Sequence, residues 1–147
     1  MALLILAGAG CGQVDKQELA YRNNYKAVWD RVVGATETGQ KKADAAYAAG
    51  DVDTVVGSYK SLAATYGAAK TSFAKLRALA GYGALAVITG DYLADGAAYY
   101  AKLAAVVEST GGNYGDAQQA EIKALQTRWD ATTKRLEKEL AKKRFKL

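Results

Sequence analysis

The chain has no histidine and no proline, and only one cysteine among its 147 residues. Without histidine, the usual nucleophile–base pairs and the Glu-x-x-His pairs of di-iron bundles cannot form. A single cysteine cannot close an internal disulfide, and it excludes the multi-cysteine motifs of zinc and redox sites. Without proline, no position lacks the backbone donor that a continuous helix requires. These absences predict a protein that is not an enzyme, uses no cofactor or metal, and is suited to long helices.

Positive charge is concentrated at one end of the chain. The last 14 residues, KRLEKELAKKRFKL, carry a net charge of +5, whereas the preceding 133 residues hold equal numbers of acidic and basic side chains. Such an end can lie on anionic lipid headgroups, bind an anionic polymer, or simply complement the dipole of a helix. Nucleic acid is the least favoured partner, because no basic face with interleaved aromatic residues is present. The residues proposed for contact with an anionic surface are Lys134, Arg135, Lys138, Lys142, Lys143, Arg144 and Lys146.

Apolar residues recur at helical spacing in four blocks after Gln13. The blocks run over Tyr21–Ala46, Val52–Ala80, Leu85–Val106 and Ile122–Leu140, with steps of three and four residues that are typical of helices packed in a bundle. In the first block, Trp29 and Val33 are expected to widen the buried stripe, and the pairs Glu18–Arg22 and Lys26–Asp30 are expected on its solvent side.

Short polar and glycine-rich segments separate the blocks. Ala49-Gly50-Asp51 offers a left-handed glycine followed by an acidic N-cap, Gly81-Tyr82-Gly83 is a tight reversal, and Thr110-Gly111-Gly112-Asn113 ends the third block. Asp116 with Gln119 resembles a capping box that opens the fourth. Since short connections force neighbouring helices to be antiparallel, we predict an all-α fold. It is an up-down-up-down four-helix bundle with long helices and a basic C-terminal helix end, forming a single domain over residues 13–147.

Tyrosine is unusually frequent, with ten residues. Buried phenols need hydrogen-bond partners, so two interpretations stay open. The inward tyrosines either pack as an ordinary core or line a groove for a small ligand or peptide. The six at inward-facing positions are Tyr21, Tyr25, Tyr59, Tyr66, Tyr92 and Tyr99.

Carboxylate pairs offer little further chemistry. Asp91 and Asp95 lie one turn apart on the weakly charged third block, and we expect them to form its solvent-facing stripe rather than an acid pair or a cation site. Asp51 and Asp53 lack the Asp-x-Asp-x-Asp-Gly loop of calcium sites, so a helix-capping role is the better interpretation.

The first dozen residues, MALLILAGAGCG, combine a short apolar run with Ala9-Gly10-Cys11. The run is far shorter than a bilayer span of about 20 residues and is near the length of a signal peptide's apolar region. In this respect the sequence resembles a bacterial lipoprotein, although Gly8 stands where that family usually has Leu and no basic residue precedes Lys16. The resemblance implies cleavage before Cys11, lipidation of Cys11, and a signal or anchor segment over residues 1–12.

Three functional hypotheses follow. The first is a non-enzymatic, lipid-anchored adaptor or scaffold of the bacterial cell envelope, held at the membrane through Cys11 and binding a protein partner or a second copy of itself. The resemblance allows the outer face of the cytoplasmic membrane or the outer membrane, because Gly12 is not the Asp that commonly retains lipoproteins at the inner membrane. The second is a small-ligand or peptide binder that uses the tyrosine-lined groove, and the third is a self-assembling structural subunit.

Overall fold

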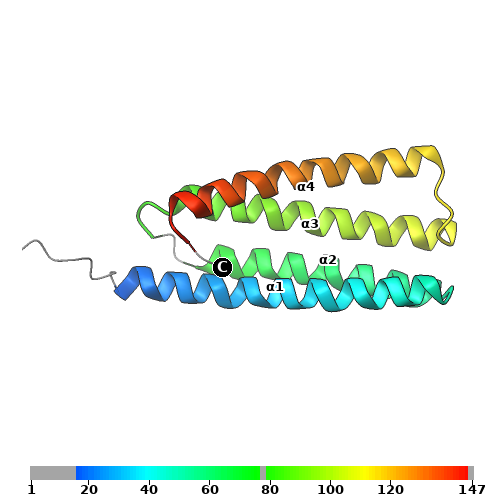
Figure 1. Ribbon diagram of the computed structural model, residues 1–147, viewed down its shortest axis with the longest axis horizontal. Coiled ribbons are helices and arrows are strands. Elements are labelled where there is room, and N and C mark those ends of the chain that lie inside the picture. The colour runs from blue at the N-terminus through cyan, green and yellow to red at the C-terminus, as the bar shows by residue number, and fades with distance from the viewer. Residues whose placement is uncertain (1–15, 77–78, 146–147) are drawn as a thin grey trace, which may run out of the picture.

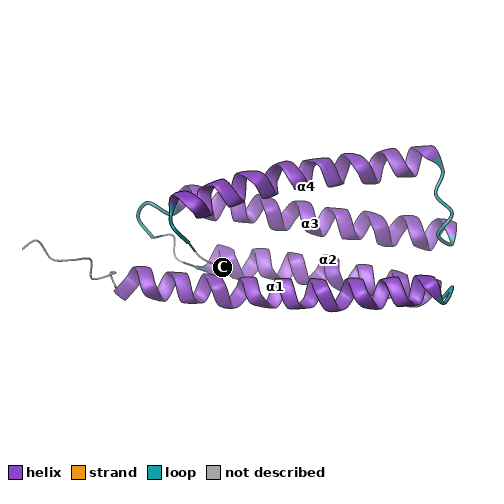
Figure 2. Ribbon diagram, viewed as in Figure 1, coloured by secondary structure: helices purple, strands orange, loops and turns teal. Residues whose placement is uncertain are grey.

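The computed structural model describes residues 16–76 and 79–145 and consists of four helices joined by short connections. They are α1 (Lys16–Ala48), α2 (Val52–Lys75), α3 (Gly83–Thr110) and α4 (Asp116–Lys142). Successive helices run antiparallel along a common long axis (Figure 1), and the described part of the chain contains no strand (Figure 2). The predicted all-α four-helix bundle is therefore confirmed. Residues 1–12 with Cys11, and Lys146, lie outside the described residues.

Local sequence explains most of the helix ends. Gly50 has a φ of +71°, and the Asp51 side chain accepts a hydrogen bond of 3.0 Å from the Thr54 amide, so α1 ends and α2 is capped as predicted. Gly111 ends α3 with a φ of +62°. The expectation for the start of α4 was wrong. Gly115 occupies the N-cap position without a side-chain cap, and Asp116 is the first helical residue.

The helices form a chain of neighbours rather than a closed square. α1 packs on α2, α2 on α3, and α3 on α4, whereas no α-carbon of α1 lies within 8 Å of an α-carbon of α4 among the described residues. Figure 1 shows α4 sloping away from α1 toward the end where α4 begins. The α1–α4 side of the bundle is therefore filled by side chains, and its packing depends on their size.

Most predicted inward positions are buried. Six residues of the α1 seam, from Tyr21 to Ala46, are buried as expected, and both predicted i,i+4 ion pairs are present with N–O distances of 2.7 Å. Val33 was expected to widen this seam, but it is 41% exposed, because no helix covers that side of α1. Trp29 does pack against the core.

α3 buries more of its surface than one seam. In addition to the predicted side, Leu93, Tyr100, Ala104 and Val107 are buried, because α3 contacts α2 on one side and α4 on the other. The same geometry corrects the expectation for Asp95. It is buried against α4, where it pairs with Arg128 at 2.7 Å and accepts a hydrogen bond of 2.8 Å from the Thr132 hydroxyl. Asp91 is exposed, as predicted.

Candidate binding cavity and cationic end

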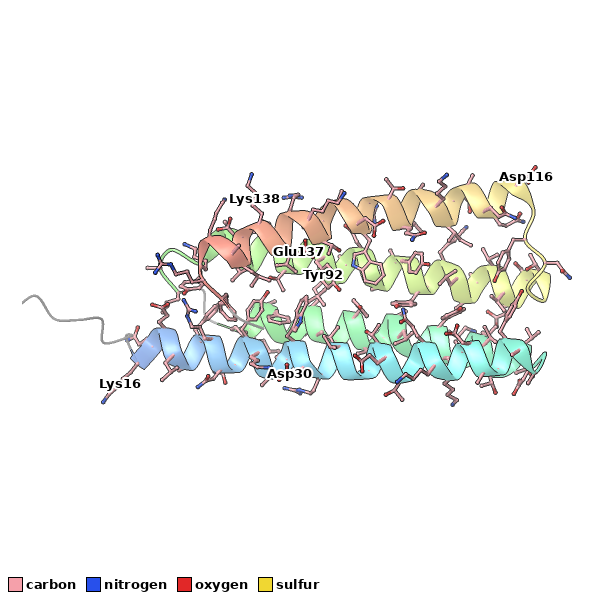
Figure 3. The ribbon with its side chains drawn as sticks, in the orientation of Figure 1. Lys16, Asp30, Tyr92, Asp116, Glu137 and Lys138 are labelled. Atoms are coloured by element: carbon pink, nitrogen blue, oxygen red, sulfur yellow. The ribbon has the colours of Figure 1, made fainter. Side chains whose placement is uncertain are left out.

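Trp129 of α4 is the centre of the aromatic packing that joins α4 to the other helices. Its ring lies 5.5 Å from that of Tyr66 on α2 and 5.6 Å from that of Tyr92 on α3, measured between centroids. Gly96 makes room for this contact, since a Cβ there would lie 2.5 Å from the Tyr66 ring and 3.0 Å from the Trp129 ring. Figure 3 shows Tyr92 pointing between the α1–α2 and α3–α4 pairs.

The structure divides the six predicted groove tyrosines between core and cavity. Tyr25 and Tyr66 are completely enclosed, and Tyr92 is packed among the rings of Trp29, Tyr66 and Trp129. Burial raises the pKa of Tyr25 and Tyr92 far above the ordinary value for a phenol, so both remain neutral. These three residues form part of the core.

Tyr21 is nearly buried, but its edge lines a broad surface groove beside the α2–α3 connection. Its ring also packs on Tyr82 at 5.0 Å, so its main contact is with the core.

Tyr59 and Tyr99 line a cavity of about 240 Å³ in the half of the bundle where α4 slopes away from α1. Tyr59 comes from α2, and Tyr99 and its neighbour Tyr100 come from α3, with the Tyr99 and Tyr100 centroids 5.4 Å apart in an edge-to-face arrangement. The Gln40 amide of α1 donates a hydrogen bond of 2.7 Å to the Tyr100 hydroxyl. The other lining residues are Asp44 and Leu103.

The electrostatic environment of this cavity is negative. Burial raises the pKa of Tyr59, and neighbouring groups that include the Asp44 carboxylate add to the effect. Burial also raises the pKa of Tyr99, together with the Asp130 carboxylate of α4. All lining residues are neutral apart from Asp44. The cavity therefore presents neutral phenol rings beside the carboxylate of Asp44.

The second candidate surface is the end of the bundle where α1 begins and α4 ends. The Arg22 guanidinium donates hydrogen bonds to the carbonyls of Lys143 at 2.9 Å and Arg144 at 3.2 Å. It also donates to the carboxylate of Glu18 and to the hydroxyl of Tyr82. The result is that the basic C-terminal end of the chain is fixed against the first turns of α1.

Six of the seven predicted basic residues are described, and all lie along the last part of α4 or just beyond it. Lys134, Lys138 and Arg144 are exposed and form no ion pair among the described residues. Arg135 approaches Asp91 at 3.9 Å, Lys142 pairs with Glu139 at 2.9 Å, and the Lys143 amine lies 5.3 Å from the centroid of the Tyr82 ring.

Figure 3 shows Lys16 and Lys138 toward one end of the molecule and Asp116 at the other.

The opposite end of the bundle is richer in acidic side chains. Its acidic residues, from the start of α2, the end of α3 and the start of α4, are Asp51, Asp53, Glu108, Asp116 and Glu121. The lysines Lys60 and Lys102 pair there with Glu108 and Glu121. Lys41, Lys42 and Lys123 also lie in this half, so its charges nearly balance, and the net positive charge of the molecule lies at the end where α4 finishes.

Sequence reasoning missed Tyr100, Asp44 and the role of Arg22. Tyr100 had a signal, because Leu93, Tyr100, Ala104 and Val107 step by seven, four and three residues and mark a second helical seam. Asp44 and Arg22 had none, because their importance depends on which helix lies across from them.

None of the four helices carries an apolar stretch sufficient to span a bilayer, and no group of three or more His, Cys, Asp or Glu side chains in residues 16–76 and 79–145 is arranged to hold a metal ion. Comparisons with protein-family models, with curated proteins and with solved structures found no match.

Proposed function

We propose that this chain is a lipid-anchored, non-enzymatic adaptor of the bacterial cell envelope that stands on an anionic membrane with its cationic end. The anchor would be Cys11, within the Ala9-Gly10-Cys11 motif that resembles a lipoprotein cleavage site. Only four residues separate Cys11 from Lys16 at the start of α1. At no more than about 3.6 Å per residue, a lipid on Cys11 would hold the start of α1 within roughly 18 Å of its attachment point.

The observation that carries the proposal is that the basic end of α4 and the start of α1, the helix that follows Cys11 in the sequence, lie at the same end of the bundle. The Arg22 hydrogen bonds to the Lys143 and Arg144 carbonyls place the basic end of α4 beside the helix that follows Cys11. Had the helices numbered three or five, the two termini would lie at opposite ends. A lipid chain combined with a basic cluster provides the two signals that stable anchoring needs, and each basic residue near an anionic surface adds about 1 kcal/mol.

A binding role, rather than catalysis, is favoured because the buried polar groups Asp95 and Thr89 form structural hydrogen bonds and an ion pair within the bundle. Asp95 is occupied by Arg128 and Thr132, and the Thr89 hydroxyl is bonded to Tyr25 at 2.7 Å and to the Leu85 carbonyl. The contacts of Asp95 join α3 to α4 and the Tyr25–Thr89 hydrogen bond joins α1 to α3, whereas the bond to the Leu85 carbonyl lies within α3. The surfaces that remain for a partner are the solvent faces of the helices, held at a distance from the membrane along the length of the bundle.

The lipid anchor is tested by intact-mass spectrometry of the chain expressed in a bacterium from its full upstream reading frame. The expected mass corresponds to cleavage before Cys11 with attached lipid, and the Cys11→Ala variant should carry none. An unmodified chain that retains residues 1–10 would overturn the anchor.

The cationic contact is tested separately, with the unlipidated Cys11→Ala protein and vesicles of phosphatidylcholine with or without phosphatidylglycerol. We expect binding only to the anionic vesicles. The triple variant K134Q/K138Q/R144Q should bind more than about tenfold more weakly, given roughly 1 kcal/mol per basic residue. The matched control K41Q/K42Q/K123Q removes the same charge from exposed positions elsewhere and should retain most of the binding. Equal losses in the two variants would mean that net charge, and not this end of the bundle, determines binding.

A further inference from the structure

We propose that the tyrosine-lined cavity between α1, α2 and α3 binds a small organic cation, such as a quaternary ammonium group. This site is independent of the membrane contact proposed above. It lies in the half of the bundle away from the Arg22 network, and its lining residues are Gln40, Asp44, Tyr59, Tyr99, Tyr100 and Leu103.

The first argument is the arrangement of the rings. Three phenol rings meet at the cavity, with the Tyr59 and Tyr100 centroids 6.2 Å apart and near parallel, and Tyr99 set at 70° to Tyr100. Ring faces carry negative potential, so several rings around one space attract a cation that is too weakly hydrated to prefer water. Tyr100 is held in place by the hydrogen bond from Gln40, so this ring is preorganised.

The second argument is charge. Asp44 lines the cavity, and the Asp130 carboxylate lies close enough to influence Tyr99. Neither carboxylate forms an ion pair with a lysine or arginine in the described part of the chain. Lys60 and Lys102, which adjoin the lining residues Tyr59 and Leu103 in the chain, are paired with glutamates. Lys41 and Lys42 precede Asp44 on α1, but they are exposed and form no ion pair with it. An anionic ligand would meet the unpaired Asp44 carboxylate here, with Asp130 close to Tyr99, whereas a cation would be attracted by both.

The third argument is the size of the cavity and the partial exposure of two of its rings. A volume of about 240 Å³ is below the roughly 300 Å³ at which pockets for drug-sized ligands begin, and it suits a compact head group. Two of the three rings that line it are incompletely enclosed and can contact a ligand, whereas Tyr100 is buried and forms the floor of the cavity. Tyr59 and Tyr99 are only half-buried, whereas Tyr25 and Tyr66 are completely covered by neighbouring side chains.

The test is calorimetric titration of the wild-type protein with choline and with its neutral isostere 3,3-dimethylbutan-1-ol, in which carbon replaces the charged nitrogen. We expect saturable binding of choline and at least about fivefold weaker binding of the isostere, because only choline gains the cation–π and carboxylate attraction. Absence of saturable choline binding, or equal binding of the two probes, would overturn the proposal. This comparison needs no variant and so does not depend on how substitutions fold.

Variants then locate the site. Asp44→Asn should weaken choline binding several-fold without changing the isostere, and Tyr99→Leu, which removes a half-buried ring, should weaken it by about fivefold. The matched control is Asp53→Asn, which removes an exposed carboxylate from the start of α2 and should leave choline affinity unchanged. Choline binding that is lost equally in the Asp44 and Asp53 variants, or in neither, would contradict the assignment to this cavity.

Discussion

The two ends of the bundle are packed by different residues, although all four helices run through both. Where α1 begins and α4 ends, the core is built from large rings, and Phe145 folds back to place its ring 4.8 Å from that of Tyr25. At the other end a separate cluster is built from the small side chains Ala46, Val55, Val56 and Val107. The cavity lies where the aromatic core gives way to this cluster and α4 moves away from α1. Large rings fill the core of one half, although a surface groove lies beside Tyr21 there. In the other half, the core cluster consists of smaller side chains and the tyrosine-lined cavity lies beside it.

Replacing one tyrosine in each half should produce the largest difference in the free energy of unfolding between the two halves. Tyr25→Ala removes a fully enclosed ring and should lower the free energy of unfolding by about 3–5 kcal/mol. Tyr99→Ala removes a half-buried ring beside an existing cavity and should cost less than about 2 kcal/mol. Urea unfolding followed by circular dichroism measures both. Similar losses would mean that the two halves are packed equally well.

Glycine substitutions sharpen the comparison at the junction between the halves. Gly96→Ala places a methyl group against the Tyr66 and Trp129 rings, and we expect a loss of about 1–3 kcal/mol. Gly34→Ala is the matched control on α1, since nothing lies within 4 Å of its added Cβ, and it should stabilise the protein by up to about 1 kcal/mol through helix propensity. A stabilising Gly96→Ala would show that α4 is not held by these rings.

The Arg22 network should control local order at the cationic end more than global stability. Arg22→Gln removes the hydrogen bonds to the Lys143 and Arg144 carbonyls, and we expect a loss of about 1–2 kcal/mol because the site is partly exposed. Hydrogen exchange should accelerate in the last turn of α4. The small-residue cluster at the other end should exchange as in the wild type, and faster exchange at both ends would argue against a local role.

The same network predicts a dependence on acid. Hydrogen bonds from Tyr82 and Arg22 hold the pKa of the Glu18 carboxyl below its ordinary value, so the folded state favours ionised Glu18. Its stabilising contribution is present at neutral pH and is lost as the pH falls through the lowered pKa. Protection of the α4 end should therefore decrease in acid in the wild type, and the decrease should be smaller in a Glu18→Gln variant, which removes the titrating group.

The enclosed tyrosines predict a loss of stability at high pH. Burial raises the pKa of Tyr25, Tyr92 and Tyr100 above the usual value, so folding stabilises the neutral phenols. Their contribution is complete below about pH 10, where unfolded tyrosine titrates, and it declines as the pH rises further. Tyrosine absorbance at high pH should show an early phase from exposed phenols and a late phase that coincides with unfolding.

The fold could be predicted from the sequence because it depends on periodicity and on glycine and aspartate at the helix ends. The seam of α1 from Tyr21 to Ala46 and the cap at Asp51 are local patterns, and both are present in the structure. The environment of Asp95 and the enclosure of Tyr100 could not be obtained in this way. A helix period identifies a buried face, but it does not say whether a second helix covers the opposite side.

For the candidate sites too, local patterns identified some residues, whereas tertiary packing determined their environment. Tyr59 and Tyr99 were identified as inward residues, yet their distinction from Tyr25 and Tyr66 depends on the slope of α4, which no local pattern encodes. The basic residues at the end of the chain were evident from charge alone. Their position beside the start of α1 follows from an even number of antiparallel helices and from the hydrogen bonds of Arg22.

The most direct test of the membrane orientation uses a fluorophore attached to a single introduced cysteine in the Cys11→Ala background. Lys138→Cys and Asp116→Cys place it at exposed positions toward the two ends (Figure 3). On phosphatidylglycerol vesicles that carry a headgroup quencher, the label at position 138 should be quenched strongly and the label at position 116 weakly. Equal quenching at both positions, or stronger quenching at position 116, would contradict the account.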